Sequence, residues 1–348
     1  MTTELLQQYQ PLLREYGIEP QFIEDLGRVK KIHSTDGILA LKQAKLPYNE
    51  IAHYERKLQF LQYKSYGYSV PVYRTKTGSF FVFDNHYSAY YLMPWLDSYN
   101  DEEERNDHAF QLFKQLGELH ANSLKEERLK DGEVDELVDW IKDHWQKRRD
   151  ELELFIEKCE ENTYMSPFQL YYCTYFQEMM RAQEFALRKL DDWKEMMDEK
   201  KKYRTVFIHG QPSFHHFLYN VEGQGLFVNF ERSGYSSPIH DLLYFFYRSC
   251  KTYPLHTDDR FQWFQTYRSH FPLQEDEVTL FMAYLAYPEN MYRVVKEYQS
   301  KSSKSELKSL QLLQRSYWQM KNIEYFLTNI VVFEEEKKKK EQQESQES

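Results

Sequence analysis

The chain of 348 residues is long enough to bury a large core and to form one large domain or two lobes. Hydrophobic residues make up 41% of the chain, and no apolar run approaches the length of a membrane span. The net charge is −10, and no cluster of Lys and Arg accompanies an aromatic platform, so we expect neither a membrane span nor a nucleic-acid partner.

The first residues, MTTELLQQYQ, lack the apolar core of a signal peptide. We therefore expect the protein to be made in, and to stay in, a cytoplasm. Leu5, Leu12 and Leu13 lie among polar residues at helical spacing, which predicts an opening helix over residues 4–16.

A β-rich part is predicted to follow this helix. The β-prone runs 29–33 and 38–42 flank the segment 34–37, whose Asp-Gly pair predicts a hairpin. Apolar residues at helical spacing predict a helix over 48–63. Three more strands are predicted, over residues 70–73, 79–83 and 90–94, the last of which stops at Pro94.

From residue 101 onward the pattern is mainly helical, interrupted by a β-hairpin around His209. Helices are predicted over residues 110–121, 136–160, 166–200 and 241–333, the last with breaks near Pro254, Pro272 and Pro288. The final residues, 334–348, consist only of Glu, Lys, Gln and Ser and predict a disordered charged tail.

These elements predict an α+β fold with two lobes. The small β-rich lobe with its N-terminal helix is expected over residues 1–95, and the helical large lobe over 96–333. The hairpin 205–231 is expected to be embedded in the large lobe, and 334–348 to be the tail.

Cysteine and tyrosine usage adds two expectations. The cysteines Cys159, Cys173 and Cys250 are odd in number and lack metal-binding spacing, so we expect reduced structural thiols. Aromatic residues reach 17%, with 29 tyrosines, which indicates either a core rich in ring packing or a surface that joins a protein assembly.

The stretch 205–241 carries the most specific pattern. His209-Gly210 follows a β-prone run, and Pro238-x-x-Asp241 follows the hairpin. This layout resembles the catalytic core of aminoglycoside-phosphotransferase-like kinases, whose fold is that of protein kinases. The resemblance implies that Gln211 stands in place of the catalytic Asp, His216 in place of the metal-binding Asn, and Asn229 in place of the metal-binding Asp.

Those three substitutions remove chemistry that phosphoryl transfer needs. Gln211 has no carboxylate, so general-base assistance worth about 10²–10⁴ in rate is absent. Mg²⁺ prefers anionic oxygen ligands, and an imidazole at His216 with an amide at Asn229 supplies fewer of them. Glu231 is the one nearby carboxylate that offers a replacement metal ligand, because it would share a strand face with Asn229.

A nucleotide site would also need a cation on a small-lobe strand and a helical Glu to hold it. Ala40 and Lys42 alternate on one predicted strand face, which fits a small residue beside adenine and a cation beside phosphates. The resemblance implies that Glu55, or else Glu50, pairs with Lys42 and that the cleft lies beneath Met93. Lys42 alone would equally fit a solvent-facing strand lysine, and no glycine-rich phosphate loop is visible.

Other residues of the motif are expected to be structural. His209 is expected to brace the loop from the core, and the pair His215-His216 gives little support for a zinc site. Asp241 is expected to cap the following helix. Leu119-His120 resembles the Leu-His pair of the kinase family's helix.

Length, tyrosine content and the loop HGQPSFHHFLYN together resemble the CotS-related spore-coat proteins of endospore-forming bacilli, and within them a YutH-like branch. That resemblance implies sporulation, synthesis in the mother-cell cytoplasm, later residence in the spore coat, and other coat proteins as partners.

Three functions therefore remain open. One is a catalytically degenerate kinase-like protein, a pseudokinase, that acts in coat assembly. The second is a residual small-molecule kinase that uses ATP with an atypical metal site, and the third is a nucleotide-sensing module without turnover. No cofactor is required by the first, whereas ATP and Mg²⁺ would serve the second.

Overall fold

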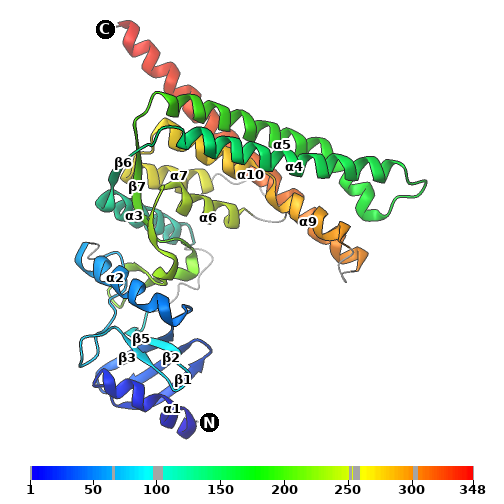
Figure 1. Cartoon of the computed structure of the whole chain (residues 1–348). Helices are drawn as coiled ribbons and strands as arrows, with labels where there is room; N and C mark the ends of the chain where they lie inside the picture. The colour runs from blue at the N-terminus through cyan, green and yellow to red at the C-terminus, as the bar shows by residue number, and fades with distance from the viewer. Residues whose placement is uncertain are drawn as a thin grey trace. The chain divides into compact units, whose positions relative to one another are not determined.

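The computed structural model describes residues 2–64, 67–96, 105–250, 253, 259–300 and 305–347, and Figure 1 shows the whole chain with most of its helices and strands labelled. The chain divides into two compact units. The first comprises Met1–Leu124, Val206–Ser236 and Ser269–Phe271. The second comprises Lys125–Thr205, Ser237–Arg268 and Pro272–Ser348. The hairpin that was expected in the helical lobe therefore belongs to the same unit as the N-terminal sheet, and the division does not follow the expected boundary at residue 95.

A five-stranded antiparallel sheet with the order β1-β2-β3-β5-β4 forms the N-terminal part of the first unit. Helix α1 (Thr2–Glu15) covers one face of the sheet, and its Leu12 and Leu13 join Ile32 and Leu41 in one apolar cluster. The strands are β1 (Pro20–Leu26), β2 (Val29–Ser34), β3 (Gly37–Gln43), β4 (Phe81–Phe83) and β5 (Ala89–Pro94).

The predicted hairpin between β2 and β3 is confirmed. Ser34 pairs with Gly37 and leaves Thr35 and Asp36 as the two-residue turn. The Ser34 hydroxyl donates to the Gly37 carbonyl at 3.0 Å and accepts from the Asp36 N–H at 3.3 Å. Gly37 has a φ of +115°, a conformation that residues with a side chain rarely adopt.

The strand predicted over residues 70–73 is wrong. Pro71 has no N–H to donate, so it does not suit a ladder. The Val70 N–H donates instead to the Phe227 carbonyl at 3.0 Å, outside the five-stranded sheet. The fifth strand is β1, which has one fully buried apolar residue, Ile23, and therefore carries little apolar periodicity.

The rest of the first unit consists of two helices and short strands around the motif segment. The second half of β7 pairs with β10, and β8 pairs with β9. The elements are α2 (Tyr48–Lys64), α3 (Arg105–Ser123), β7 (Lys202–Ile208), β8 (Phe217–Tyr219), β9 (Gly225–Phe227) and β10 (Gly234–Ser236), with 3-10 turns at Phe214–His216 and Phe230–Arg232. Only residues 206–208 of β7 belong to this unit, and its first half lies in the second.

The second unit is built mainly from helices. The two longest predicted helices are confirmed as α4 and α5, which lie side by side (Figure 1). Ser166 caps α5 through a reciprocal pair of hydrogen bonds with Gln169, and Pro167 follows at the first helical position. The elements are β6 (Lys125–Arg128), α4 (Glu133–Glu160), α5 (Pro167–Asp198), α6 (Ile239–Ser249), α7 (Asp259–His270), α8 (Glu275–Ala286), α9 (Glu289–Gln299) and α10 (Glu306–Glu347).

The proline breaks separate these helices where the structure describes them. Pro272 lies between α7 and α8, and Pro288 precedes α9. Pro254 lies outside the described residues. Asp241 is not the cap of α6, because Pro238 occupies that position; Asp241 lies in the first turn and is fully buried.

The charged tail is helical rather than disordered. Helix α10 continues to Glu347, although the side chains of residues 336–344 are exposed. Glu, Lys and Gln are strong helix formers, so a composition that cannot make a core can still extend an existing helix. Lys338 pairs with Glu275 at 2.5 Å and Lys337 with Glu341 at 3.7 Å along this extension.

Many of the aromatic side chains fill the core, as the first of the two interpretations expected. Phe246, Phe264, Phe281 and Phe326 form one cluster of ring contacts in the second unit, and Tyr54 and Tyr91 are fully buried in the first. Among the described residues, no helix is long and apolar enough to cross a membrane.

Candidate active site

The sheet face opposite α1 carries Lys42. In the register of β3 and β5, Lys42 pairs with Tyr91 and Ala40 pairs with Met93. Alternate residues share a face, so these four side chains lie on the same side of the sheet, and all four residues are buried. A cation thus stands on the inner face of the small sheet, with a small residue and a methionine beside it.

Two side chains from the motif segment hold Lys42. Its ammonium donates to Asn229 Oδ1 and lies 3.5 Å from Glu231 Oε1, while the Tyr91 ring centroid is 5.5 Å away. The Lys42 side chain is 11% exposed and that of Glu231 is 8% exposed. Burial lowers the pKa of Lys42, and the Glu231 charge opposes that shift. The ion pair is therefore almost fully removed from solvent.

Glu55 does not hold Lys42, contrary to what the resemblance implied. Its carboxylate accepts hydrogen bonds from the Phe80 N–H at 3.0 Å and from the Ser79 hydroxyl at 3.3 Å. Glu50 lies exposed in the first turn of α2. Glu55 therefore anchors α2 to the chain just before β4, and the counter-charge of Lys42 comes from Glu231 instead.

The sequence pattern suggested that Asn229 and Glu231 lie on one strand, but in the structure neither residue is part of a strand. The chain leaves β9 at Phe227, and Asn229 adopts a left-handed conformation with a φ of +71°. Asn tolerates this conformation better than most residues. The 3-10 turn Phe230–Arg232 follows, and it returns Glu231 to the side of Lys42.

The loop before β8 is held by His209. This fully buried ring donates through Nε2 to the Val228 carbonyl at 2.8 Å and accepts from the Gln211 N–H at 3.3 Å. Gly210 has a φ of +85°, and a Cβ there would lie 2.2 Å from the Arg232 carbonyl oxygen. Only glycine fits this close approach, so Gly210 fixes the path of the loop after β7.

His216 closes the same loop. Its Nδ1 donates to the Gln211 carbonyl at 2.9 Å. Burial lowers the pKa of His216, and the nearby charge of Lys42 lowers it further. The imidazole is therefore neutral near pH 7, and its ring stacks on His209 with centroids 5.9 Å apart.

These residues do not fit a Mg²⁺ ion. Gln211 and Asn229 offer neutral amides, His216 offers a nitrogen, and the carboxylate of Glu231 already faces Lys42. Glu231 Oε1 accepts no hydrogen bond, but one carboxylate oxygen falls short of the anionic oxygen set that Mg²⁺ prefers. Within the described ranges, no group of three or more His, Cys, Asp or Glu side chains is arranged to hold a metal.

A small cavity adjoins this cluster. It measures about 10 Å³ and lies between α2, Tyr91 and the segment Asn229–Phe230. A space of that size holds about one water molecule. Burial among these residues raises the pKa of the Tyr91 hydroxyl well above its usual value, and Tyr54 lies beside it on the wall of the cavity.

The profile of the ecdysteroid kinase-like family matches residues 98–277, which is just over half of the chain. The chain belongs to the ecdysteroid kinase-like family. Its match covers α3, the loop of His209 to His216, and the segment that carries Asn229 and Glu231. None of the curated proteins compared with the chain is significantly similar to it in sequence.

Solved structures identify the fold of this family member. An aminoglycoside phosphotransferase from Alicyclobacillus acidocaldarius aligns with a TM-score of 0.68 at 14% identity, over 94% of this chain and 96% of that one. Spectinomycin phosphotransferase APH(9)-Ia, solved with ADP and spectinomycin, aligns with a TM-score of 0.53 at 12% identity, over 93% and 99%. The fold is therefore that of aminoglycoside phosphotransferases and protein kinases, as the sequence predicted.

The structure brings together Lys42, Asn229, Glu231 and His216, all of which the sequence singled out. Sequence reasoning missed that the carboxylate beside Lys42 is that of Glu231 and not that of Glu55. A signal for it existed, since Glu231 is the carboxylate nearest in sequence to Asn229, but a strand pattern suggested a metal ligand rather than an ion pair.

Proposed function

We propose that this ecdysteroid kinase-like protein is a pseudokinase, a kinase-like fold without phosphoryl transfer. One observation carries the proposal: Lys42, the cation that would face nucleotide phosphates, is already occupied by Asn229 and Glu231. The positions for the base and the metal ligands hold Gln211, His216 and Asn229, which supply no anionic oxygen.

Phosphoryl transfer relies on positioning and on the electrostatic stabilisation of developing charge. Gln211 cannot accept the proton of an attacking hydroxyl. A neutral His216 and an amide at Asn229 do not neutralise or anchor a metal-bound triphosphate. In this proposal, His209 and Gly210 fix the conformation of the loop for the stability of the fold and have no part in a reaction.

The cellular role that we propose is a part in spore-coat assembly. The support is the likeness of the loop HGQPSFHHFLYN and of the tyrosine content to CotS-related coat proteins. Such a protein would be made in the mother-cell cytoplasm and then bind other coat proteins. Exposed tyrosines such as Tyr164 and Tyr63, which are 92% and 84% exposed, suit contacts in a protein layer.

A fluorescent fusion expressed from the native promoter in sporulating cells tests this role. We expect a ring of fluorescence around the forespore, whereas the fluorescent protein alone stays diffuse. Diffuse mother-cell fluorescence throughout sporulation would contradict the coat assignment and leave the question of turnover to the enzymatic assay.

A second candidate, a nucleotide-binding module without turnover, is favoured by one feature. Ala40, Lys42 and Met93 share the inner face of the sheet, and spectinomycin phosphotransferase APH(9)-Ia, which has the same fold, was solved with ADP. A thermal-shift titration with ATP and GTP, each with and without Mg²⁺, separates the two candidates. A concentration-dependent rise in melting temperature supports the module, and a flat response supports the pseudokinase without nucleotide.

A further inference from the structure

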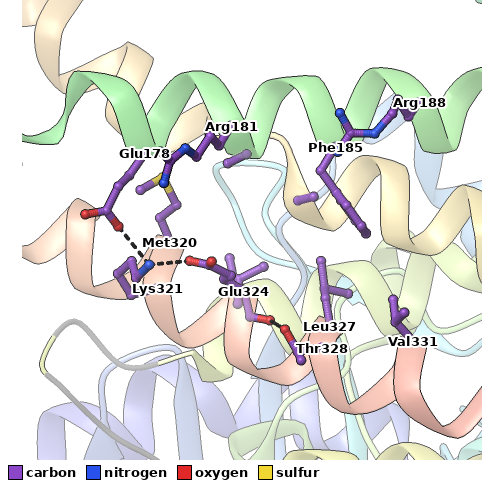
Figure 2. A pocket seen from close by; sticks show the side chains of 13 residues that line it. Glu178, Arg181, Phe185, Arg188, Met320, Lys321, Glu324, Leu327, Thr328 and Val331 are labelled. Atoms are coloured by element: carbon purple, nitrogen blue, oxygen red, sulfur yellow. Dashed lines mark hydrogen bonds and ion pairs between the residues drawn. The ribbon is translucent and has the colours of Figure 1, made fainter.

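The second unit contains a pocket between α5 and α10 that shares no residue with the candidate active site. Its volume is about 330 Å³, within the range of small-molecule sites (Figure 2). The lining residues on α5 run from Glu178 to Arg188, and those on α10 from Met320 to Val331. Each stretch is about 15 Å long at the helical rise, so the pocket is an elongated groove.

The wall of this groove is apolar over much of its length. The Phe185 ring points from α5 toward Leu327 of α10, and Val331 continues the same side (Figure 2). Met320 and Ala286 complete the apolar lining. A slender apolar chain, rather than a compact polar molecule, suits this shape.

The charged groups at the rim are not balanced. Lys321 lies between two carboxylates, at 2.7 Å from Glu178 and 2.5 Å from Glu324, so its charge is engaged (Figure 2). Arg181 lies close enough to Glu178 for its charge to lower the pKa of that carboxyl, whereas no ion pair joins Arg188 to another described residue. The charged lining residues are three cations (Arg181, Arg188 and Lys321) and two carboxylates (Glu178 and Glu324), so the groove carries one excess positive charge.

The two arginines lie on one side of α5. They are seven residues apart, which is about two helical turns and about 10 Å along the axis. Both are exposed, and each guanidinium offers a planar set of donors that matches a carboxylate, sulfate or phosphate. Exposed arginines above an apolar wall are an arrangement that recognises an anionic head on an apolar body.

We propose that the α5–α10 groove binds a small amphipathic anion, with its apolar chain along Phe185, Leu327 and Val331 and its single negative group on Arg181 or Arg188. The excess of one positive charge favours a monoanion over a neutral or cationic ligand of the same length. This inference is independent of whether the Lys42 site binds nucleotide.

Decanoate is a suitable probe, with decylamine as the matched cation of the same chain length. Binding to the full chain is followed by displacement of the fluorescent anion anilinonaphthalene sulfonate and by isothermal titration. We expect saturable one-to-one binding of decanoate and at least about tenfold weaker binding of decylamine, because the charge preference rests on the two arginines.

Substitutions distinguish the groove from nonspecific adsorption. Arg181→Gln and Arg188→Gln should together weaken decanoate binding about tenfold, and Phe185→Ala should weaken both decanoate and decylamine. Arg315→Gln is the matched control, since Arg315 is an exposed arginine of α10 outside the groove, and it should leave binding unchanged.

Equal affinity for decanoate and decylamine, or equal loss with Arg315→Gln, would overturn the proposal. So would the absence of saturable binding with a folded protein, verified by circular dichroism. A dimer that dissociates on Arg188→Glu and does not bind decanoate would instead assign the groove to a second copy of the chain, and would equally overturn it.

Discussion

Replacing Lys42 with methionine should destabilise the protein strongly, because the lysine neutralises a buried carboxylate. Methionine keeps the apolar stem but removes the ammonium that contacts Asn229 and lies 3.5 Å from Glu231 Oε1. With Glu231 only 8% exposed, little solvent is available to compensate. Removing one partner of a buried pair costs about 3–5 kcal/mol.

The companion change Glu231→Gln removes the orphaned charge. We therefore expect Lys42→Met combined with Glu231→Gln to be less destabilised than the sum of the single variants, with a coupling of about 1–3 kcal/mol. Urea unfolding followed by circular dichroism measures all four proteins of the cycle. A Lys42→Met protein as stable as the parent, or a coupling below about 0.5 kcal/mol, would refute the view that this lysine is structural.

Three further substitutions test the loop beside this pair and the cap of helix α5. Gly210→Ala should lower the melting temperature well beyond Gly223→Ala. Both glycines have a positive φ, but only a Cβ at residue 210 would meet a carbonyl oxygen, at 2.2 Å. Equal melting temperatures of the two variants would argue against the close approach. The pKa of His216 lies below its usual 6.5, so the unfolded chain takes up the proton first as pH falls. Stability present above about pH 6.5 should thus be lost on acidification, and His216→Asn should flatten that slope in melting scans; an unchanged slope would count against burial as the cause. Ser166→Ala should cost about 1 kcal/mol through loss of the α5 cap, and a neutral effect in urea unfolding would show that Pro167 suffices.

The strands and helices with strong local signals were predictable from the sequence. The hairpin around Thr35 and Asp36 and the long helices α4 and α5 have turn chemistry or sustained helical spacing. Strand β1 was missed because only Ile23 in it is fully buried. The segment around Pro71 was mistaken for a strand because the prediction followed its β-prone residues, although proline has no N–H to donate to a neighbouring strand.

The site was predictable in its members but not in its pairing. The resemblance to the kinase family identified Lys42, Asn229 and, beside it, Glu231, yet it could not show that a left-handed Asn229 and a 3-10 turn would bring Glu231 to the lysine. The helical tail was missed for a different reason. A polar composition rules out a core, but it does not prevent an existing helix such as α10 from continuing.

Phosphate transfer is the measurement that tests the central claim most directly. The purified chain is incubated with labelled ATP, Mg²⁺ and sets of sugars, amino-alcohols and aminoglycosides, beside a variant that carries Gln211→Asp, His216→Asn and Asn229→Asp. We predict no transfer above background by the unmodified protein, and tighter Mg²⁺-dependent nucleotide binding by the variant. Robust turnover by the unmodified protein that disappears on Glu231→Gln would contradict the account, since Glu231 would then be a metal ligand rather than the counter-ion of Lys42.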